Sequence, residues 1–221
     1  LIVNCLPLNE GERRAFAKAA RDVPQEFVGD EAHRGDMVWS AAVPEELRSR
    51  ATAVIGNFPV SQASQYTRLE WLQTFSAGVD AYICPGVLPR GTMVTNASGA
   101  YGQSVSEHMF ATMWALMKNL NRYASNQRDH QWQDEGPVLS PEGGIALIIG
   151  VGDIGSHFAQ LAQSVGMRTF GVRRHADVPA KGIEKMYGFE RLETLLPLAD
   201  VVAMAVPRSP PDPSSAECGS S

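Results

Sequence analysis

The sequence predicts an α/β protein with two lobes, each built on a parallel β-sheet. Short apolar segments alternate along the chain with amphipathic helical segments, and this alternation is typical of parallel sheets covered by helices. The segment 145–149 is apolar without interruption, which indicates a strand buried on both faces. A length of 221 residues, 44% of them hydrophobic and 19% charged, is sufficient for two small domains with a core in each.

The composition narrows the possible classes of partner. A net charge of −5 and a pI near 5.5 argue against nucleic acid or an anionic membrane as the main partner. No apolar run approaches the roughly 20 residues that span a bilayer, and the segment 1–7 lacks a basic leader, so it predicts a strand rather than a signal peptide. Three widely spaced cysteines without a Cys-x-x-Cys pair suit the cytoplasm better than a disulfide framework or a zinc site. We therefore expect a cytoplasmic protein with a small-molecule partner and no bound metal.

The first lobe is expected over residues 1–98. Asn9 is placed to cap a helix, and Glu12 three residues later completes a capping-box pattern, so a helix should begin here. Further short helices are expected near 45–50 and 61–66. The parallel sheet predicts a flavodoxin-like lobe. Its strands are expected at 1–6, 26–28, 53–56, 71–75 and 92–95.

A long helix and a polar connection are expected over residues 99–144, between the lobes. Ser104 and Glu107 form a second capping-box pattern. The stretch 122–144 is polar, with Trp132 as an apolar anchor. Apolar residues recur along the helix at helical spacing, which predicts one buried face. These residues are Val105, Met109, Met113, Leu116, Met117 and Leu120.

The second lobe is expected over residues 145–207. Helices are predicted at 154–165 and 190–198. The segment 208–221 is rich in serine and proline and has no apolar periodicity, which predicts a disordered tail. The strands of this lobe are expected at 145–149, 168–172, 184–187 and 201–206.

The motif Gly150-Val-Gly152-Asp-Ile-Gly155 stands between the first strand and the first helix of this lobe. In such a G-x-G-x-x-G pattern the first glycine permits a tight turn and the second lets a pyrophosphate approach the backbone. The third lets the helix pack closely on the strand. The helix N-terminus then presents free N–H groups to the phosphates. The motif predicts a partial Rossmann lobe that binds a dinucleotide; a glycine-rich turn without a ligand is the alternative.

The end of the next strand bears on the choice of cofactor. An acidic residue there holds the ribose 2′-hydroxyl of NAD, whereas arginine accommodates the 2′-phosphate of NADP. Arg173 and Arg174 follow the strand, and no acid occurs before Asp177. Because two guanidinium groups suit a dianionic phosphate, we expect NADP, with NAD as the alternative. Two solvated surface arginines are the other interpretation of this pair.

These segments together resemble the D-isomer-specific 2-hydroxyacid dehydrogenases, and the likeness covers nearly all of residues 1–207. The sequence Phe75-Ser-Ala-Gly-Val-Asp80 is similar to the family's substrate loop. Val94-Thr-Asn96 and the segment 102–108 resemble the part beside the nicotinamide, and 199–207 resembles the strand under the adenosine. The resemblance implies hydride transfer between a nicotinamide and a small 2-oxo or 2-hydroxy acid, in a homodimer joined through the cofactor lobe.

The resemblance also implies the residues of two binding sites. Backbone N–H groups of Ala77, Gly78 and Val79 are expected to bind the substrate carboxylate. Cofactor contacts are expected from the glycine turn and from the two strand ends beside it. The cofactor-binding residues are then Gly150, Gly152, Asp153, Ile154, Gly155, Arg173, Arg174, Val206 and Pro207.

The catalytic residues that the resemblance implies have no match in this sequence. The family's catalytic histidine, its paired glutamate and its substrate-binding arginine come from segments beyond position 207. The chain has five histidines, none at the matching place: His33, His108, His130, His157 and His175. A positioned proton donor is worth a factor of roughly 10²–10⁴ in rate. We therefore expect negligible turnover by these 221 residues, through truncation or a shifted reading frame.

Two other function classes remain open on the sequence. A dinucleotide-sensing, corepressor-like binding protein would need no catalytic residues, although it would also need no substrate loop. A methyltransferase-like nucleotide fold is the weaker interpretation, because its glycine pattern normally lacks a preceding substrate lobe of this type.

Overall fold

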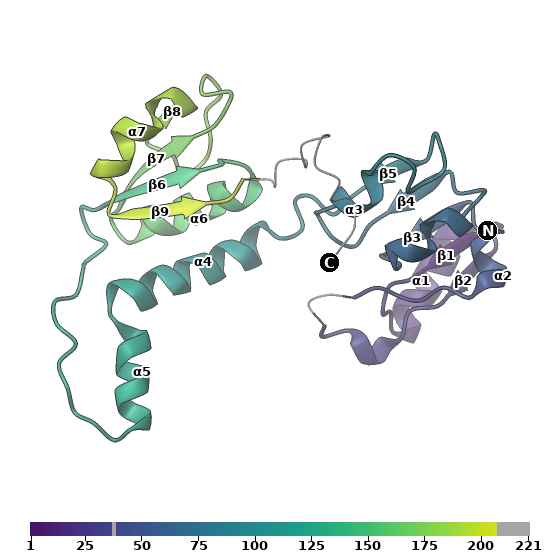
Figure 1. Cartoon of the computed structure of the whole chain (residues 1–221), viewed down its shortest axis with the longest axis horizontal. Helices are drawn as coiled ribbons and strands as arrows, with labels where there is room; N and C mark the ends of the chain where they lie inside the picture. The colour runs from purple at the N-terminus through teal and green to yellow at the C-terminus, as the bar shows by residue number, and fades with distance from the viewer. Residues whose placement is uncertain (37–38, 207–221) are drawn as a thin grey trace. The chain divides into compact units, whose positions relative to one another are not determined.

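The computed structural model describes residues 1–36 and 39–206, and these form two compact units (Figure 1). The first unit covers Leu1–Ser98, and the second begins at Gly99. Pro207 and the expected tail 208–221 lie outside the described residues. Within the described residues, no helix has the length and apolar character needed to cross a membrane.

The first unit contains a five-stranded sheet in the order β2-β1-β3-β4-β5, with every pair of strands parallel. This is the flavodoxin-like order, so the prediction for this lobe is confirmed. Both short helices that the sequence predicts differ from expectation, because the first covers only Glu45–Arg48 and the segment 60–65 is a 3₁₀ helix. The strands are β1 (Ile2–Asn4), β2 (Gln25–Phe27), β3 (Ala53–Ile55), β4 (Trp71–Gln73) and β5 (Met93–Thr95). The helices are α1 (Glu10–Ala20), α2 (Glu45–Arg48), α3 (Asp80–Ile83) and the 3₁₀ helices η1 (Glu31–His33) and η2 (Val60–Gln65).

The core of this unit forms around the middle of the sheet. Val3, Val54 and Leu72 are fully buried at matching positions of three adjacent strands. The ring of Phe58 packs against Tyr66 and Tyr82, with ring centroids 4.3 Å and 5.2 Å away. This packed core holds the strands in place, and with them the loops that follow the strand ends.

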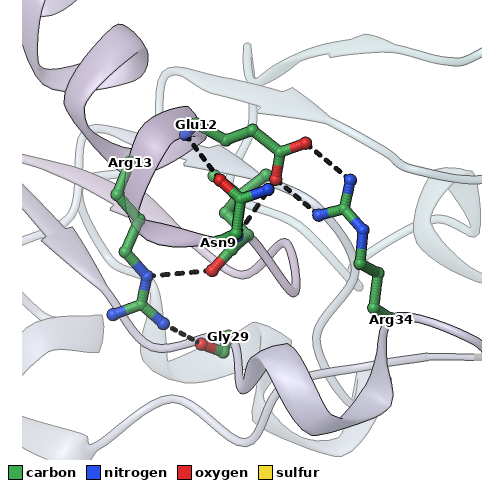
Figure 2. Close-up of polar contacts among 6 residues, drawn as sticks. Asn9, Glu12, Arg13, Gly29 and Arg34 are labelled. Carbon is green, nitrogen blue, oxygen red and sulfur yellow. Dashed lines mark hydrogen bonds and ion pairs between the residues drawn. The ribbon is translucent and has the colours of Figure 1, made fainter.

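The N-terminus of α1 is fixed by the capping box that the sequence predicts (Figure 2). The side chain of Asn9 accepts a hydrogen bond from the Glu12 N–H at 2.9 Å, and the Glu12 carboxylate accepts one from the Asn9 N–H at 3.0 Å. Arg34 donates to both oxygens of the same carboxylate, at 2.5 Å and 2.6 Å. Arg13 donates to the Gly29 carbonyl at 2.7 Å. These bonds tie the loop after β2 to the first helix.

The second unit contains a four-stranded parallel sheet in the order β8-β7-β6-β9. Numbered within this lobe, the order is 3-2-1-4, which is the arrangement of the first four strands of a doubly wound Rossmann sheet. The prediction of a partial Rossmann lobe with a parallel sheet is confirmed. The strands are β6 (Ile145–Ile149), β7 (Arg168–Val172), β8 (Lys185–Tyr187) and β9 (Val201–Met204).

Helices cover both faces of this sheet. Figure 1 shows α4 and α6 on one face and α7 on the other. Ala146 and Ile148 point into the core shared with α4 and α6, while Leu147 and Ile149 belong to the core under α7. The helices are α4 (Gly102–Met117), α5 (Leu120–Arg128), α6 (Asp153–Ser164), α7 (Leu192–Leu195) and the 3₁₀ helices η3 (Phe189–Arg191) and η4 (Leu196–Leu198).

The expected start of the long helix is wrong. The helix begins at Gly102 rather than after a Ser104 cap, so Ser104 lies inside the first turn. Gly102 permits this earlier start because a Cβ there would lie 2.3 Å from the Asp153 carboxylate at the beginning of α6. Glycine therefore lets the two helices approach closely at their N-terminal ends.

The expected buried face of α4 is only partly right. Met113 and Met117 are buried with Ser106 on the side that packs against α6. In contrast, Leu116 and Leu120 have exposed fractions of 66% and 51%. Leu116 lies on another side of α4, and Leu120 is the first residue of α5, so both leave apolar surface uncovered in the second unit.

Two further helix predictions are corrected by the structure. The polar stretch after residue 121 is helical as far as Arg128, as part of α5, because Asn119 takes a left-handed conformation (φ 53°) that ends α4 and reorients the chain. The helix expected at 190–198 is broken into η3, α7 and η4. Pro197 lies within η4, and proline lacks the N–H that a regular α-helix needs.

Candidate functional site

The glycine turn lies at the C-terminal end of β6, where the chain enters α6. Gly150 has φ +90°, and a Cβ there would lie 2.5 Å from the Ala205 carbonyl oxygen and 2.8 Å from a methyl carbon of Val206. A Cβ on Gly155 would lie 2.2 Å from the Gly150 carbonyl oxygen. No atom lies within 4 Å of the place where a Cβ on Gly152 would stand. Packing thus excludes a side chain at Gly150 and Gly155, whereas Gly152 borders open space.

The first turn of α6 offers free hydrogen-bond donors at this open space. Gly152 is the N-cap, and no side chain caps the helix. In the described part of the chain, the N–H groups of Gly152, Asp153 and Ile154 find no hydrogen-bond acceptor. Uncapped N–H groups and the positive end of the helix dipole favour an anion. The open glycine and the free donors together fit a phosphate group.

A cavity of about 500 Å³ opens beside the glycine turn. It lies between the turn, one face of α6 and the segment 179–181 that precedes β8. Arg173 lines the cavity, whereas Arg174 is exposed and is not part of its wall. The wall is formed by Val151, Gly152, Asp153, Ser156, His157, Gln160, Arg173, Pro179, Ala180 and Lys181.

Sequence reasoning missed four polar residues of this wall. Ser156, His157 and Gln160 follow the turn at the spacing of one helix face, and that spacing is the signal by which they could have been found. His157 Nδ1 lies 3.3 Å from the Asp153 carboxylate and 2.9 Å from its carbonyl oxygen. Lys181 comes from a loop whose path no local pattern predicts.

The segment 75–79 forms a tightly held loop after β4 in the first unit. The Phe75 N–H donates to the Asn57 side chain at 2.9 Å, and the Asn96 amide donates to the Ala77 carbonyl at 2.7 Å. The Ser76 hydroxyl donates to the Gly78 carbonyl at 2.7 Å. Two asparagines from the ends of neighbouring strands therefore fix the shape of this loop. Asn57 was not singled out from the sequence, although it also follows a strand at the same edge of the sheet.

The same loop presents backbone N–H groups to its surroundings. Ala77 and Gly78 are exposed, and a Cβ on Gly78 would meet nothing within 4 Å. Among the described residues, the N–H groups of Ala77, Gly78 and Val79 have no acceptor. Consecutive free N–H groups in a turn form a concave site for a negatively charged oxygen. The loop can therefore receive a carboxylate.

The sheet order of the second unit and its unobstructed glycine turn define a Rossmann-type dinucleotide-binding protein. Comparison with known families gives a narrower assignment. Residues 110–212 match the model of the D-isomer specific 2-hydroxyacid dehydrogenase, NAD binding domain. This match covers just under half of the chain, and it confirms the resemblance to the D-isomer specific 2-hydroxyacid dehydrogenases that the sequence predicts.

Individual relatives agree with this assignment. A glycerate dehydrogenase of Methylorubrum extorquens is 25% identical over 177 residues, which are 76% of this chain and 54% of the relative. The structure of a D-isomer specific 2-hydroxyacid dehydrogenase family protein from Aeromonas salmonicida superposes with a TM-score of 0.76 and 24% identity, over 94% of this chain and 64% of that one.

A third relative is an NADPH-dependent glyoxylate/hydroxypyruvate reductase from Sinorhizobium meliloti, solved with NADP and sulfate. It has a TM-score of 0.65 and 18% identity, over 95% of this chain and 63% of that one. The chain thus spans about half to two thirds of the length of these relatives.

Proposed function

We propose that the protein is a nicotinamide-dependent oxidoreductase that transfers a hydride between its cofactor and a small 2-oxo or 2-hydroxy acid. One observation carries the proposal. A Cβ on Gly152 would face open space, whereas a Cβ on Gly150 or Gly155 would clash with neighbouring atoms. A turn that served only to connect a strand and a helix would have no need of an unobstructed glycine between two obstructed ones. The family that residues 110–212 match supports the same chemistry.

The residues of the turn fit the pyrophosphate of a dinucleotide. The N–H groups of Gly152, Asp153 and Ile154 would donate to its oxygens, and Gly150 and Gly155 would hold the backbone in the shape that points these donors outward. Val206 lies against Gly150 and would border the same site. When bound, the nicotinamide ring supplies the hydride donor or acceptor of the reaction.

The substrate part of the proposal rests on the loop after β4. The N–H groups of Ala77, Gly78 and Val79 would bind the carboxylate that every 2-oxo acid carries, and Asn57 and Asn96 would keep the loop in its binding shape. Donors fixed before binding stabilise a charge without the cost of reorienting them. The chemical group attached to the 2-oxo carbon is not specified by this loop.

We propose NADP as the preferred cofactor, with NAD as the alternative. Among the described residues, Asp153 of the turn is the one acidic residue in the wall of the cavity beside Gly152, and Arg173 and Lys181 contribute cationic side chains. An acidic residue at the end of the second strand would instead favour NAD. The Sinorhizobium reductase, which shares the fold, was solved with NADP.

We also propose that the protein is a homodimer formed through α4, α5 and the segment that follows them. Trp132 is completely exposed (105%), and Leu116 is 66% exposed. Large exposed apolar patches on a folded protein mark interaction sites. A cavity of about 630 Å³ between Tyr123 and the segment 131–134 offers a recess for a side chain of the second copy. The other exposed apolar residues of this surface are Leu120, Val138 and Leu139.

Cofactor binding is tested by calorimetric titration of the full chain with NADPH and with NADH. We expect binding by the parent and loss of binding in Gly152→Val, because the valine side chain fills the space that the pyrophosphate needs. Gly35→Val is the matched control, since Gly35 also faces open space but lies in the other unit. Equal affinities of Gly152→Val and the parent would rule out the turn as the binding site. Consumption of NADPH in the presence of glyoxylate, pyruvate or hydroxypyruvate tests the reaction itself.

Dimer formation is tested by light scattering with Leu116→Glu. The charge should shift the chain toward the monomer, whereas Val23→Glu, at a similarly exposed apolar position of the first unit, should not. A parent chain that remains monomeric at tens of micromolar would contradict the proposed homodimer.

A further inference from the structure

The cationic side chains that line the cofactor cavity differ in how many hydrogen bonds they make within the protein. Arg173 Nε donates to the His175 carbonyl at 2.9 Å, and Nη1 donates to the Val151 carbonyl at 3.3 Å. Its other terminal nitrogen, Nη2, donates to the Val178 carbonyl. Three of the five N–H groups of a guanidinium are thus used by backbone carbonyls.

These three bonds join two parts of the cavity wall. Val151 belongs to the glycine turn, whereas His175 and Val178 belong to the loop between β7 and β8. Arg173 therefore fastens this loop to the turn. A residue that holds the wall in place acts on the ligand through the loop, which is a positioning role.

Unlike Arg173, Lys181 is available to bind a ligand. Its side chain is exposed and, in the part of the chain that the structure describes, makes no ion pair or hydrogen bond. The next residue fixes its place: Gly182 has φ +75°, and a Cβ there would lie 2.6 Å from the backbone nitrogen of Gln160 in α6. Direct contact between the loop and α6 at this glycine keeps Lys181 in the cavity wall.

We propose that Lys181 determines the preference for NADP(H) by binding the 2′-phosphate, and that Arg173 is a positioning residue that holds the loop for it. The inference rests on the proposed cofactor site at the glycine turn. A 2′-phosphate carries a charge of about −1.5 to −2 at neutral pH, and an ammonium binds such a group as a point charge. Arg174 lies outside the cavity wall and contributes little to the choice.

The role of Lys181 is tested by titrating Lys181→Met with NADPH and NADH. We expect affinity for NADPH to fall about tenfold, as for loss of one charged hydrogen bond, with affinity for NADH unchanged. Lys185→Met is the matched control, because Lys185 is exposed at the start of β8 and does not line the cavity. An unchanged NADPH affinity in Lys181→Met, or an equal loss in Lys185→Met, overturns the assignment.

The outcomes distinguish this inference from the proposed function on which it rests. A parent chain that binds NADPH and NADH equally refutes the role of Lys181 but leaves the dinucleotide site intact. A parent chain that binds neither refutes both.

The positioning role is tested with Arg173→Lys, which keeps the charge but not the three separate N–H directions. We expect faster hydrogen exchange of the segment 175–178 and similar weakening of NADPH and NADH binding. If Arg173 instead contacted the phosphate, Arg173→Lys would retain much of the NADPH preference and Arg173→Met would lose NADPH affinity alone. That result, with hydrogen exchange of the loop unchanged, would overturn the positioning role.

Discussion

The packing of the glycine turn predicts different effects when Gly155 and Gly152 are each replaced by alanine. A Cβ on Gly155 would lie 2.2 Å from the Gly150 carbonyl oxygen and 3.1 Å from a methyl carbon of Ile148. Both neighbours belong to the turn and the buried strand β6, so neither can move away without disturbing the sheet. Gly152 has nothing within 4 Å of its Cβ position and a negative φ of −101°, so a Cβ there meets no neighbouring atom.

The magnitude follows from two opposing effects at Gly155. Forcing an extra carbon into a packed region typically costs about 1–3 kcal/mol. Alanine inside a helix returns up to about 1 kcal/mol relative to glycine. We therefore expect Gly155→Ala to destabilise the second unit by about 1–2 kcal/mol. For a chain of this size each kcal/mol lowers the melting temperature by about 2–4 °C. Gly152→Ala should stay within about 0.5 kcal/mol of the parent.

Hydrogen exchange of the β6 peptide measures this difference in the second unit alone, which avoids assuming that both units unfold together. Calorimetric titration with NADPH on the same variants separates stability from binding. Gly155→Ala should lose stability, whereas Gly152→Ala should keep its stability and bind NADPH more weakly. The reasoning is refuted if Gly152→Ala destabilises β6 as much as Gly155→Ala does, because the space at Gly152 would then not be open.

Three other predictions concern stability and surface. Hydrogen bonds from Arg34 and from the Asn9 N–H lower the pKa of Glu12 to about 2 from 4.5. A lowered pKa stabilises the folded state above pH 4.5 and loses this effect as the pH falls toward 2, so the advantage of the parent over Glu12→Gln in urea unfolding should shrink across that window. Asn57→Ala removes the acceptor of the Phe75 N–H, and exchange of the segment 75–78 should become faster. Met204 is 67% exposed on β9, an edge strand among the described residues. Met204→Lys should therefore reduce the apparent mass in light scattering at high concentration, and no change would show that β9 takes no part in association.

The sheets could be predicted from the sequence because their strands are short apolar segments between clear helix and turn signals. The strand 145–149 has no polar residue, and its structural bounds are Ile145–Ile149. The helix after residue 98 was harder, since its boundary depends on Gly102 fitting against Asp153 of a helix about fifty residues later in the chain. Such tertiary contacts override a local capping pattern.

The exposure of Leu116 illustrates a related limit. Its spacing suits a buried helix face, but periodicity cannot say which of two apolar sides meets the rest of the same chain. The structure places Met113 and Met117 against α6 and leaves Leu116 uncovered. Such an exposed apolar residue is compatible with a helix that packs against a second copy of the chain. Periodicity alone does not distinguish that helix face from one buried in the core.

Local sequence also predicts one part of the candidate sites and not the other. Both proposed anion sites use backbone N–H groups at the C-terminal ends of parallel strands. Glycine is needed there for backbone shape and for open space, so a glycine motif reveals such a site directly. The choice between NADP and NAD depends instead on side chains, and Lys181 reaches the cavity only because Gly182 lets its loop lie on α6. In the proposed site, affinity for the pyrophosphate and selectivity for the 2′-phosphate would therefore come from separate parts of the chain. Substitutions in the loop 175–181 can change the preferred cofactor while the turn and the sheet remain as they are.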